Sequence, residues 1–213
     1  MTRKEKIGEL AEFLEKAYPE VPVFLKAKDD FFFLVAVILS AQAQDKVVNK
    51  VLPPLEERYK DIRGLASASY PEVLSLIRIV GLGPSKAKNI IALAQVLHDQ
   101  YHDEIPLDRS ELEKLPGIGH KTSGVFLGER HHGLYIPVDT HIERITKRLK
   151  IVPSSYKPEQ IEEILEKNYK GKEPMKFHRQ MILFGRNICL ASAKRHCDQC
   201  PFMFCKDRIA AQD

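Results

Sequence analysis

Apolar residues recur every three to four positions along most of the chain, and this period predicts α-helices. The segment from Thr2 to Glu5 has the form of a capping box, so we expect a first helix that runs to a stop at Pro19. Residues 30–41 are apolar on every side after Asp30, which predicts a central buried helix. Because no stretch alternates convincingly with a period of two, the pattern predicts an all-α chain of about ten helices.

Proline, glycine and short polar residues mark where the other helices begin and end. Asp45 is expected to cap a helix that ends before Pro53 and Pro54. The next expected helices open at 69–72, with a stop at 81, and within 81–86, with an end near 101. The remaining ones start at 108–111 or span 120–130, 141–149, 158–169 and 174–189.

The order of helix, Gly-x-Gly turn and helix occurs twice, at Gly81-Leu82-Gly83 and at Gly117-Ile118-Gly119. These glycines interrupt the helical hydrogen bonds and permit the positive φ angles of a tight turn. A helix that restarts at His120 would point its unpaired backbone N–H groups at solvent, where a phosphate oxygen can bind. Lys121 would lie beside that phosphate.

The composition limits the structural class of the protein but says little about its function. With 213 residues and 44% apolar content, the chain can form one large or two small packed domains. No apolar run reaches the 18 residues of a membrane span, and the N-terminus lacks the apolar region of a signal peptide, so we expect a reducing compartment and no disulfides. The net charge is +4, and residues 22–133 carry 14 basic and 14 acidic side chains, so all of the excess lies outside them. Such an excess is weak evidence for a nucleic-acid partner, because solvated surfaces commonly have it.

All four cysteines lie within the last 25 residues, in a segment with little helical pattern. They are Cys189, Cys197, Cys200 and Cys205. Such crowding predicts that the thiolates organise this segment around a metal, and both Zn²⁺ and an iron-sulfur cluster are compatible with four thiolates. Lys194 and Arg195 lie on the first loop between them, where they would either contact phosphates or form a solvated basic loop.

Five motifs in this order resemble those of the endonuclease III family of DNA glycosylases, and the resemblance covers nearly the whole chain. They are Leu39-Ser40-Ala41-Gln42, Gly81-Leu82 with Ser85-Lys86-Ala87, Leu115 to Gly119 with Lys121-Thr122, Val138-Asp139-Thr140-His141 with Arg144, and the terminal cysteines. The resemblance implies an all-α helix-hairpin-helix glycosylase fold with two domains. A six-helix domain would span 22–133, and residues 1–21 plus 134–213 would form a second helical domain that carries a [4Fe-4S] cluster.

The same resemblance implies that Lys121 is the nucleophile and Asp139 the catalytic carboxylate. A glycosylase that is also a lyase needs an amine to attack C1′ of the damaged nucleotide and hold the sugar as a Schiff base. An amine attacks only when it is neutral, and a pocket at a helix N-terminus disfavours its charge. Asp139 would take up a proton or stabilise the positive charge that develops on the sugar. The plainer interpretations are a surface lysine and an aspartate that caps a helix.

An enzyme that reaches C1′ must take the nucleotide out of the base stack, and by the resemblance Gln42 and Leu82 fill the space it leaves. Leu82 between two glycines would form an exposed apolar tip, unless it packs under the turn as a core contact. The remaining DNA contacts that the resemblance or the basic loop suggests are Gly117, Gly119, His120, His141, Lys194 and Arg195. A monovalent cation at the hairpin is a further expectation from the family.

The chain departs from the family pattern at three places. The cysteine spacing is x7, x2, x4 where x6, x2, x5 is usual, His120 replaces an arginine and Gln44 replaces a threonine. Structural zinc therefore stays open as the alternative to the cluster.

From these features we expect a monomeric, cytoplasmic glycosylase and lyase that removes oxidised pyrimidines from damaged double-stranded DNA. One alternative is a mismatch-type or adenine-specific glycosylase of the same fold, and Lys121 argues against its strictly monofunctional forms. The other is a non-catalytic DNA-binding module with structural zinc, which would leave Lys121 and Asp139 unexplained.

Overall fold

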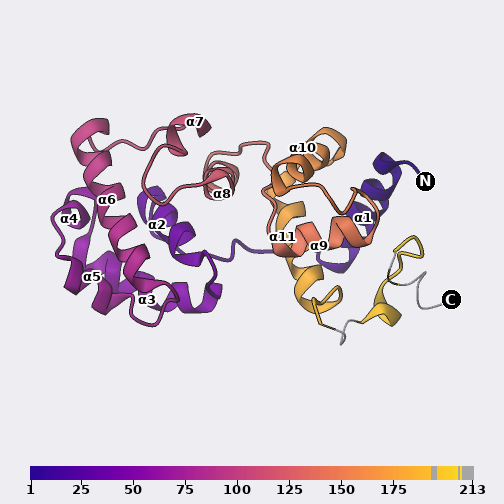
Figure 1. Cartoon of the computed structure of the whole chain (residues 1–213), viewed down its shortest axis with the longest axis horizontal. Coiled ribbons are helices and arrows are strands. Elements are labelled where there is room, and N and C mark those ends of the chain that lie inside the picture. Colours follow the sequence, from indigo (N-terminus) through magenta and orange to yellow (C-terminus); the bar gives the residue numbers. More distant parts are fainter. Residues whose placement is uncertain (193–195, 206, 208–213) are drawn as a thin grey trace. The chain divides into compact units, whose positions relative to one another are not determined.

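The computed structural model describes residues 1–192, 196–205 and 207, and these form helices and loops without a strand (Figure 1). The all-α prediction is therefore confirmed. The chain divides into two compact units, Val23–His131 and Met1–Pro22 together with His132–Asp213.

The unit formed by Val23–His131 is built around α2 (Asp30–Ser40). Asp29 caps this helix, and its carboxylate accepts a hydrogen bond from the backbone N–H of Phe32 at 2.8 Å. All nine residues from Phe31 to Leu39 are buried, because α2 packs against α3 (Asp45–Tyr59), α6 (Gly83–Tyr101) and α8 (His120–Arg130). Each fully buried leucine or phenylalanine stabilises the fold by about 1.5–3 kcal/mol, so this helix forms the core that holds the others in place.

Three short helices complete this unit. They are α4 (Ile62–Ala66), α5 (Tyr70–Leu76) and α7 (Arg109–Leu112), of which α4 and α5 pack on α6 while α7 packs on α8. The helix α4 was not predicted, since one turn is too short to show a periodic pattern. Asp61 caps it by accepting from the backbone N–H of Gly64 at 2.8 Å.

The prediction for α3 was wrong at both ends. Gln44 is the residue before the helix, and Asp45 is the first helical residue instead of the cap. The helix also continues through Pro53 and Pro54 to Tyr59. Its apolar face extends past the prolines and is buried, which outweighs the helix hydrogen bonds that proline cannot donate. The buried residues of α3 are Val48, Val51, Leu52, Leu55 and Tyr59.

The other unit contains α1 (Arg3–Ala17), α9 (Thr140–Arg148), α10 (Pro158–Asn168) and α11 (Pro174–Asn187). The predicted capping box is present, since the Thr2 side chain accepts from the backbone of Glu5 and the Glu5 side chain accepts from the backbone of Thr2. In this unit α11 packs against α1 and α9, and Phe177, Met181 and Phe184 of α11 lie in the shared core. A short 3₁₀ turn, η1 (Cys197–Gln199), lies in the cysteine segment.

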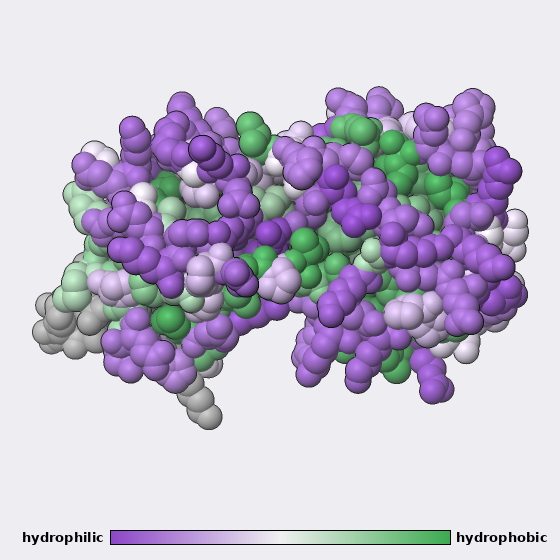
Figure 2. Space-filling view, turned by 180° about the vertical axis from the view of Figure 1, so that it is seen from behind, coloured by the Kyte–Doolittle hydropathy of each residue, from purple (hydrophilic) through white to green (hydrophobic). Residues whose placement is uncertain are grey.

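The surface is mostly hydrophilic, and the face in Figure 2 has apolar residues only in small groups among polar ones. The exposed large apolar side chains are Met1, Val23, Ile79, Leu82, Leu107, Leu134 and Met203. None of the described helices combines the length and the apolar character that crossing a bilayer requires.

Candidate functional site

The hairpin before α8 has one glycine in the left-handed region. Gly117 has a φ of 78°, and a Cβ at this position would lie 2.9 Å from the Cβ of Asn89. Ile118 between the glycines is buried, and its N–H donates to the carbonyl of Leu115 at 3.1 Å. Gly119 has a φ of −109°, which any residue can adopt, so only Gly117 uses the positive φ that a glycine permits in this turn.

Gly119 precedes the first residue of α8 and offers no side-chain oxygen as a cap. The first N–H groups of a helix have no partner within the helix, and they are usually satisfied by a capping side chain, water or a ligand. The turn at Gly117–Gly119 therefore leaves the N-terminus of α8 suited to an anion such as phosphate.

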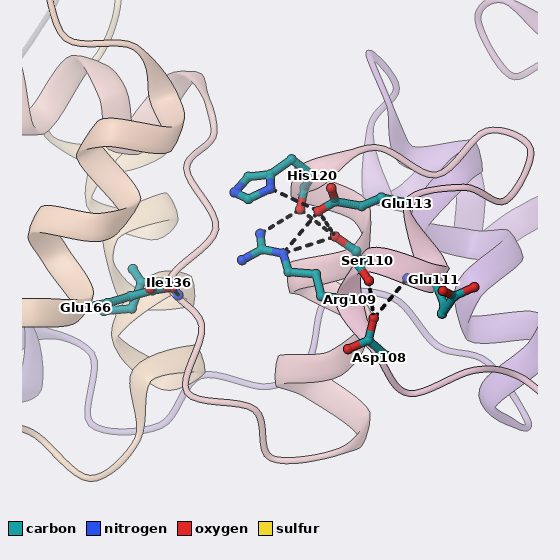
Figure 3. A network of polar contacts seen from close by, with 9 residues as sticks. Asp108, Arg109, Ser110, Glu111, Glu113, His120, Ile136 and Glu166 are labelled. Carbon is teal, nitrogen blue, oxygen red and sulfur yellow. Dashed lines mark hydrogen bonds and ion pairs between the residues drawn. The ribbon is translucent and has the colours of Figure 1, made fainter.

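A polar network ties α7 to this first turn of α8 (Figure 3). Arg109 donates from Nη2 to the carbonyl oxygen of His120 at 2.8 Å, and its Nε lies 3.3 Å from the carboxylate of Glu113. The same carboxylate lies 3.0 Å from Nδ1 of His120 and accepts from the Ser123 hydroxyl at 3.0 Å. The network fixes both the backbone and the ring of His120, the residue immediately before Lys121.

Lys121 is the second residue of α8, and its side chain is exposed. The sequence predicts a pocket around this amine, and the exposure of Lys121 contradicts that prediction for the free protein. What the fold does supply is a fixed backbone position at the positive end of α8. Any loss of water around the amine must therefore come with a ligand.

Two exposed tips in the same unit have left-handed backbone at residues other than glycine. Gln42 has a φ of 54° and follows α2, while Leu82 has a φ of 60° and directly precedes α6. Leu82 is 55% exposed, so it does not pack as a core contact under the turn. Such conformations cost free energy, and they are found where the surrounding structure enforces them, often at functional sites.

Asp139 belongs to the other unit, where it caps α9 and is partly buried. Its Oδ1 accepts from the backbone N–H of Ile142 at 2.8 Å, so the cap interpretation holds. The segment before it is pinned at two points, since Ile136 donates its N–H to Glu166 at 3.1 Å (Figure 3) and Nδ1 of His178 lies 2.8 Å from the carbonyl oxygen of Pro137. The carboxylate thus projects from a rigid frame.

His141 lies against α11 and is held by Arg144. A Cβ at Gly185 would be 2.7 Å from the Cβ of His141, so the ring needs a glycine beneath it. Nη2 of Arg144 donates to Nδ1 of His141 at 3.0 Å and to the carbonyl of Gly185 at 2.9 Å. Burial lowers the pKa of His141, while the nearby Asp139 carboxylate acts in the opposite direction. A neutral ring with Nδ1 as acceptor leaves Nε2 as its N–H donor.

All four cysteines line one small cavity, although they come from different stretches of the segment. Among the described residues, no three side chains of the His, Cys, Asp and Glu types converge on a single metal-ion position. Burial raises the pKa of the Cys200 thiol, and the three neighbouring cysteines act in the same direction. Thiolates in this cavity therefore require positive charge beside them.

Arginines supply part of that charge. Arg148 donates from Nη1 to Sγ of Cys189 at 3.4 Å and to the carbonyl of Leu190 at 2.6 Å, and it pairs with Asp207 at 2.9 Å. Arg144 donates to the carbonyl of Cys189 at 2.9 Å, which links the cysteine segment to α9. Lys194 and Arg195, expected on the basic loop, lie outside the described residues.

Comparison with known proteins decides the family. The model of the HhH-GPD superfamily of base excision DNA repair proteins matches residues 35–170. Endonuclease III of Bacillus subtilis (strain 168) is 35% identical over 93% of this chain and 87% of its own length. Endonuclease III of Escherichia coli (strain K12) is 36% identical over 92% of each. The chain belongs to the endonuclease III family.

Solved structures agree with this assignment to the endonuclease III family. A trapped endonuclease III–DNA covalent intermediate superposes with a TM-score of 0.92 at 35% identity and covers 100% of both chains. A non-covalent endonuclease III–DNA complex has a TM-score of 0.93, also at 35% identity, over 100% of this chain and 99% of that one. A thermostable thymine-DNA glycosylase, at 20% identity and a TM-score of 0.84, shares the fold alone.

The sequence does not reveal all of the residues that support the candidate site. The ion network of Arg109 and Glu113 gave no signal, because both look like ordinary surface charges on a short helix. Lys86 belongs to the motif Ser85-Lys86-Ala87, which by itself predicts no role for it. Its signal was present, since it falls on the apolar face of α6, in register with Ile90 and Leu97.

We predict that Gly117→Ala destabilises the protein by about 1–3 kcal/mol, because the new side chain must adopt positive φ and clashes with Asn89. Gly119→Ala is the matched control. Nothing lies within 4 Å of a Cβ at Gly119, so its unfolding free energy should stay within about 0.5 kcal/mol of wild type. Urea denaturation of both variants checks the difference, and equal losses would contradict the assigned turn geometry.

Proposed function

We propose that the protein is a bifunctional DNA glycosylase and abasic-site lyase of base excision repair that removes oxidised pyrimidines from duplex DNA. Lys121 acts as the nucleophile and Asp139 as the catalytic carboxylate. The observation that carries the proposal is an exposed lysine fixed in the first turn of α8. It occurs in a chain that shares 35% identity, over its full length, with an endonuclease III trapped as a covalent intermediate with DNA.

The proposed reaction begins when the neutral amine of Lys121 attacks C1′ of the extruded nucleotide. The glycosidic bond breaks, the base leaves with a proton, and loss of the ring-oxygen bond gives a Schiff base between Lys121 and C1′. Removal of a proton from C2′ then expels the 3′ phosphate, and water hydrolyses the Schiff base to free the lysine. Because Lys121 is exposed in the free protein, bound DNA must displace the water that favours the charged amine.

Asp139 combines a structural and a chemical role in this proposal. Its Oδ1 caps α9, which fixes the carboxylate in one orientation, and we assign to Oδ2 the contact with the reacting groups. A fixed carboxylate stabilises the oxocarbenium-like charge on the sugar better than a mobile one, because no reorganisation is needed at the moment of reaction. It can also accept the proton that Lys121 must lose.

Contacts to DNA follow from the same geometry. The first backbone N–H groups of α8 would bind a phosphate independently of sequence, with Gly117 and Gly119 allowing its close approach. Gln42 and Leu82 would fill the space that the extruded nucleotide leaves, and the exposed apolar tip of Leu82 suits a wedge between bases. Phosphate contacts by His120, His141, Lys194 and Arg195, and a monovalent cation at the hairpin, stay predictions.

A [4Fe-4S] cluster is the group that the four cysteines would hold. The donor set consists of four thiols that line one cavity, and four thiolates are the usual ligands of such a cluster. When bound, the cluster would cross-link the four cysteines of the segment. Its iron ions would offset the negative charge of the buried thiolates. The hydrogen bonds of Arg144 and Arg148 to Cys189 would transmit that rigidity to α9 and so to Asp139.

We predict that Asp139→Asn lowers the single-turnover rate of base excision by about 100-fold or more, while DNA affinity and the melting temperature stay near wild type. Asparagine caps helices as well as aspartate does, so the substitution removes the charge and keeps the cap. Asp61→Asn, at the cap of α4, is the matched control and should excise at the wild-type rate. If Asp139→Asn also excised at that rate, Asp139 would be a cap only.

We predict that the purified protein contains about four irons per chain, absorbs visible light and carries no stoichiometric zinc. Cys200→Ala should lose both the iron and the colour, because it removes one of the four thiols. His196→Ala, at the same cavity, should keep them because it removes no thiol. A colourless wild-type protein with one zinc per chain would overturn the cluster.

A further inference from the structure

Lys86 is a buried lysine whose amine contacts only backbone oxygens among the interactions of the described residues. It lies in the first turns of α6 and is 4% exposed. Its Nζ donates to the carbonyl of Leu39 at 2.8 Å and to the carbonyl of Ala41 at 2.6 Å. Both carbonyls belong to the C-terminal end of α2, where the helix dipole favours a positive charge.

Such an arrangement is costly compared with an apolar residue at the same place. Removing an ammonium group from water disfavours its charge, and burial lowers the pKa of Lys86. A methionine of similar length would fill the site without this penalty, so packing alone gives no reason for a lysine here. What a methionine could not do is bind two carbonyls and thereby fix the path of the chain beyond α2.

The chain beyond α2 leads directly to one of the two strained tips. Gln42 follows Ala41, and Leu82 is joined to Lys86 by the hydrogen bond from the Lys86 N–H to the Leu82 carbonyl at 3.1 Å. A Cβ at Gly81 would lie 3.6 Å from the carbonyl oxygen of Gln42, so the two segments are in contact. One lysine therefore connects both tips, through its side chain to the first and through its backbone to the second.

We infer that Lys86 is a positioning residue that locks the Gln42 loop to the Leu82 turn, so that both tips enter the duplex as one rigid wedge. The inference rests on the proposed function, in which these tips replace the extruded nucleotide. A wedge that is rigid before binding loses little conformational freedom on entering DNA. Without these hydrogen bonds, the tips relax from their left-handed conformations. The separation of the stacked bases then becomes slower.

The experiment must separate this role from a general contribution to stability. A damaged base in a regular pair must be unpaired and unstacked before excision, whereas a mismatched damaged base is already loosened and costs less to extrude. A defective wedge therefore slows excision from the regular pair more than from the mismatch. A loss of folded protein lowers both excision rates by the same factor. The ratio of the two rates therefore measures how well the wedge opens the duplex.

For Lys86→Met we expect single-turnover excision of thymine glycol to fall about 10-fold or more opposite adenine, and less than about 3-fold opposite a mismatched base. Lys88→Met is the matched control, since it removes the same charge from an exposed position of the same helix. We expect its effect to be equal on both substrates. Equal rate losses on both substrates for Lys86→Met, or none, would overturn the inference.

Two further measurements keep the inference testable if Lys86→Met does not fold. Lys86→Arg keeps the charge and the donors, and it should retain the wild-type ratio of the two excision rates. Hydrogen exchange of the wild-type protein should show residues 41–43 protected nearly as well as the end of α2, and fast exchange there would contradict a rigid lock. Wild-type protein that excises neither lesion would instead refute the proposed function, leaving the two failures distinguishable.

Discussion

The unsatisfied N–H groups at helix N-termini are the constraint on which the site depends. Three helices are each preceded by a residue with a proposed role. Leu82 precedes α6, Gly119 precedes α8 and Asp139 precedes α9. Only α9 receives a side-chain cap from that residue, and the cap is the proposed catalytic carboxylate. In α6 and α8 the preceding residue offers no side-chain oxygen, which suits these helices to phosphate. One physical rule thus underlies both the proposed phosphate contact and the placement of Lys121.

Hydrogen bonds and ion pairs that are anchored on the buried core of each unit hold these helix ends in place. In one unit, α2 supplies an apolar core, and on it Arg109, Glu113 and Lys86 fix the hairpin and the exposed tips. In the other, Arg144 and Arg148 connect the cysteine segment to α9. Each unit holds one of the two proposed catalytic groups in a defined local orientation. The strain at the tips persists because these surroundings enforce it.

Much of this was predictable from the sequence, because it depends on local chemistry. The continuous apolar run located α2, the Gly-x-Gly turn located the start of α8, and the motif Val138 to His141 located the carboxylate that caps α9. Features that depend on contacts distant in sequence were not predictable. The prolines in α3 do not end the helix as predicted, because burial of a continuous apolar face outweighs their effect. The exposure of Lys121 likewise contradicts the expected pocket. The role of Lys86 required seeing which carbonyls its amine reaches.

The central claim is that the Lys121 amine forms the covalent bond to the sugar. The most direct test is borohydride reduction of the wild-type protein on a duplex with an abasic site, followed by tryptic digestion and mass spectrometry. The account predicts the sugar adduct on the peptide 115–130, uncleaved at Lys121, because trypsin does not cut after a modified lysine. An adduct on another lysine or on the N-terminal amine, or an equal yield of adduct from Lys121→Gln, would contradict it.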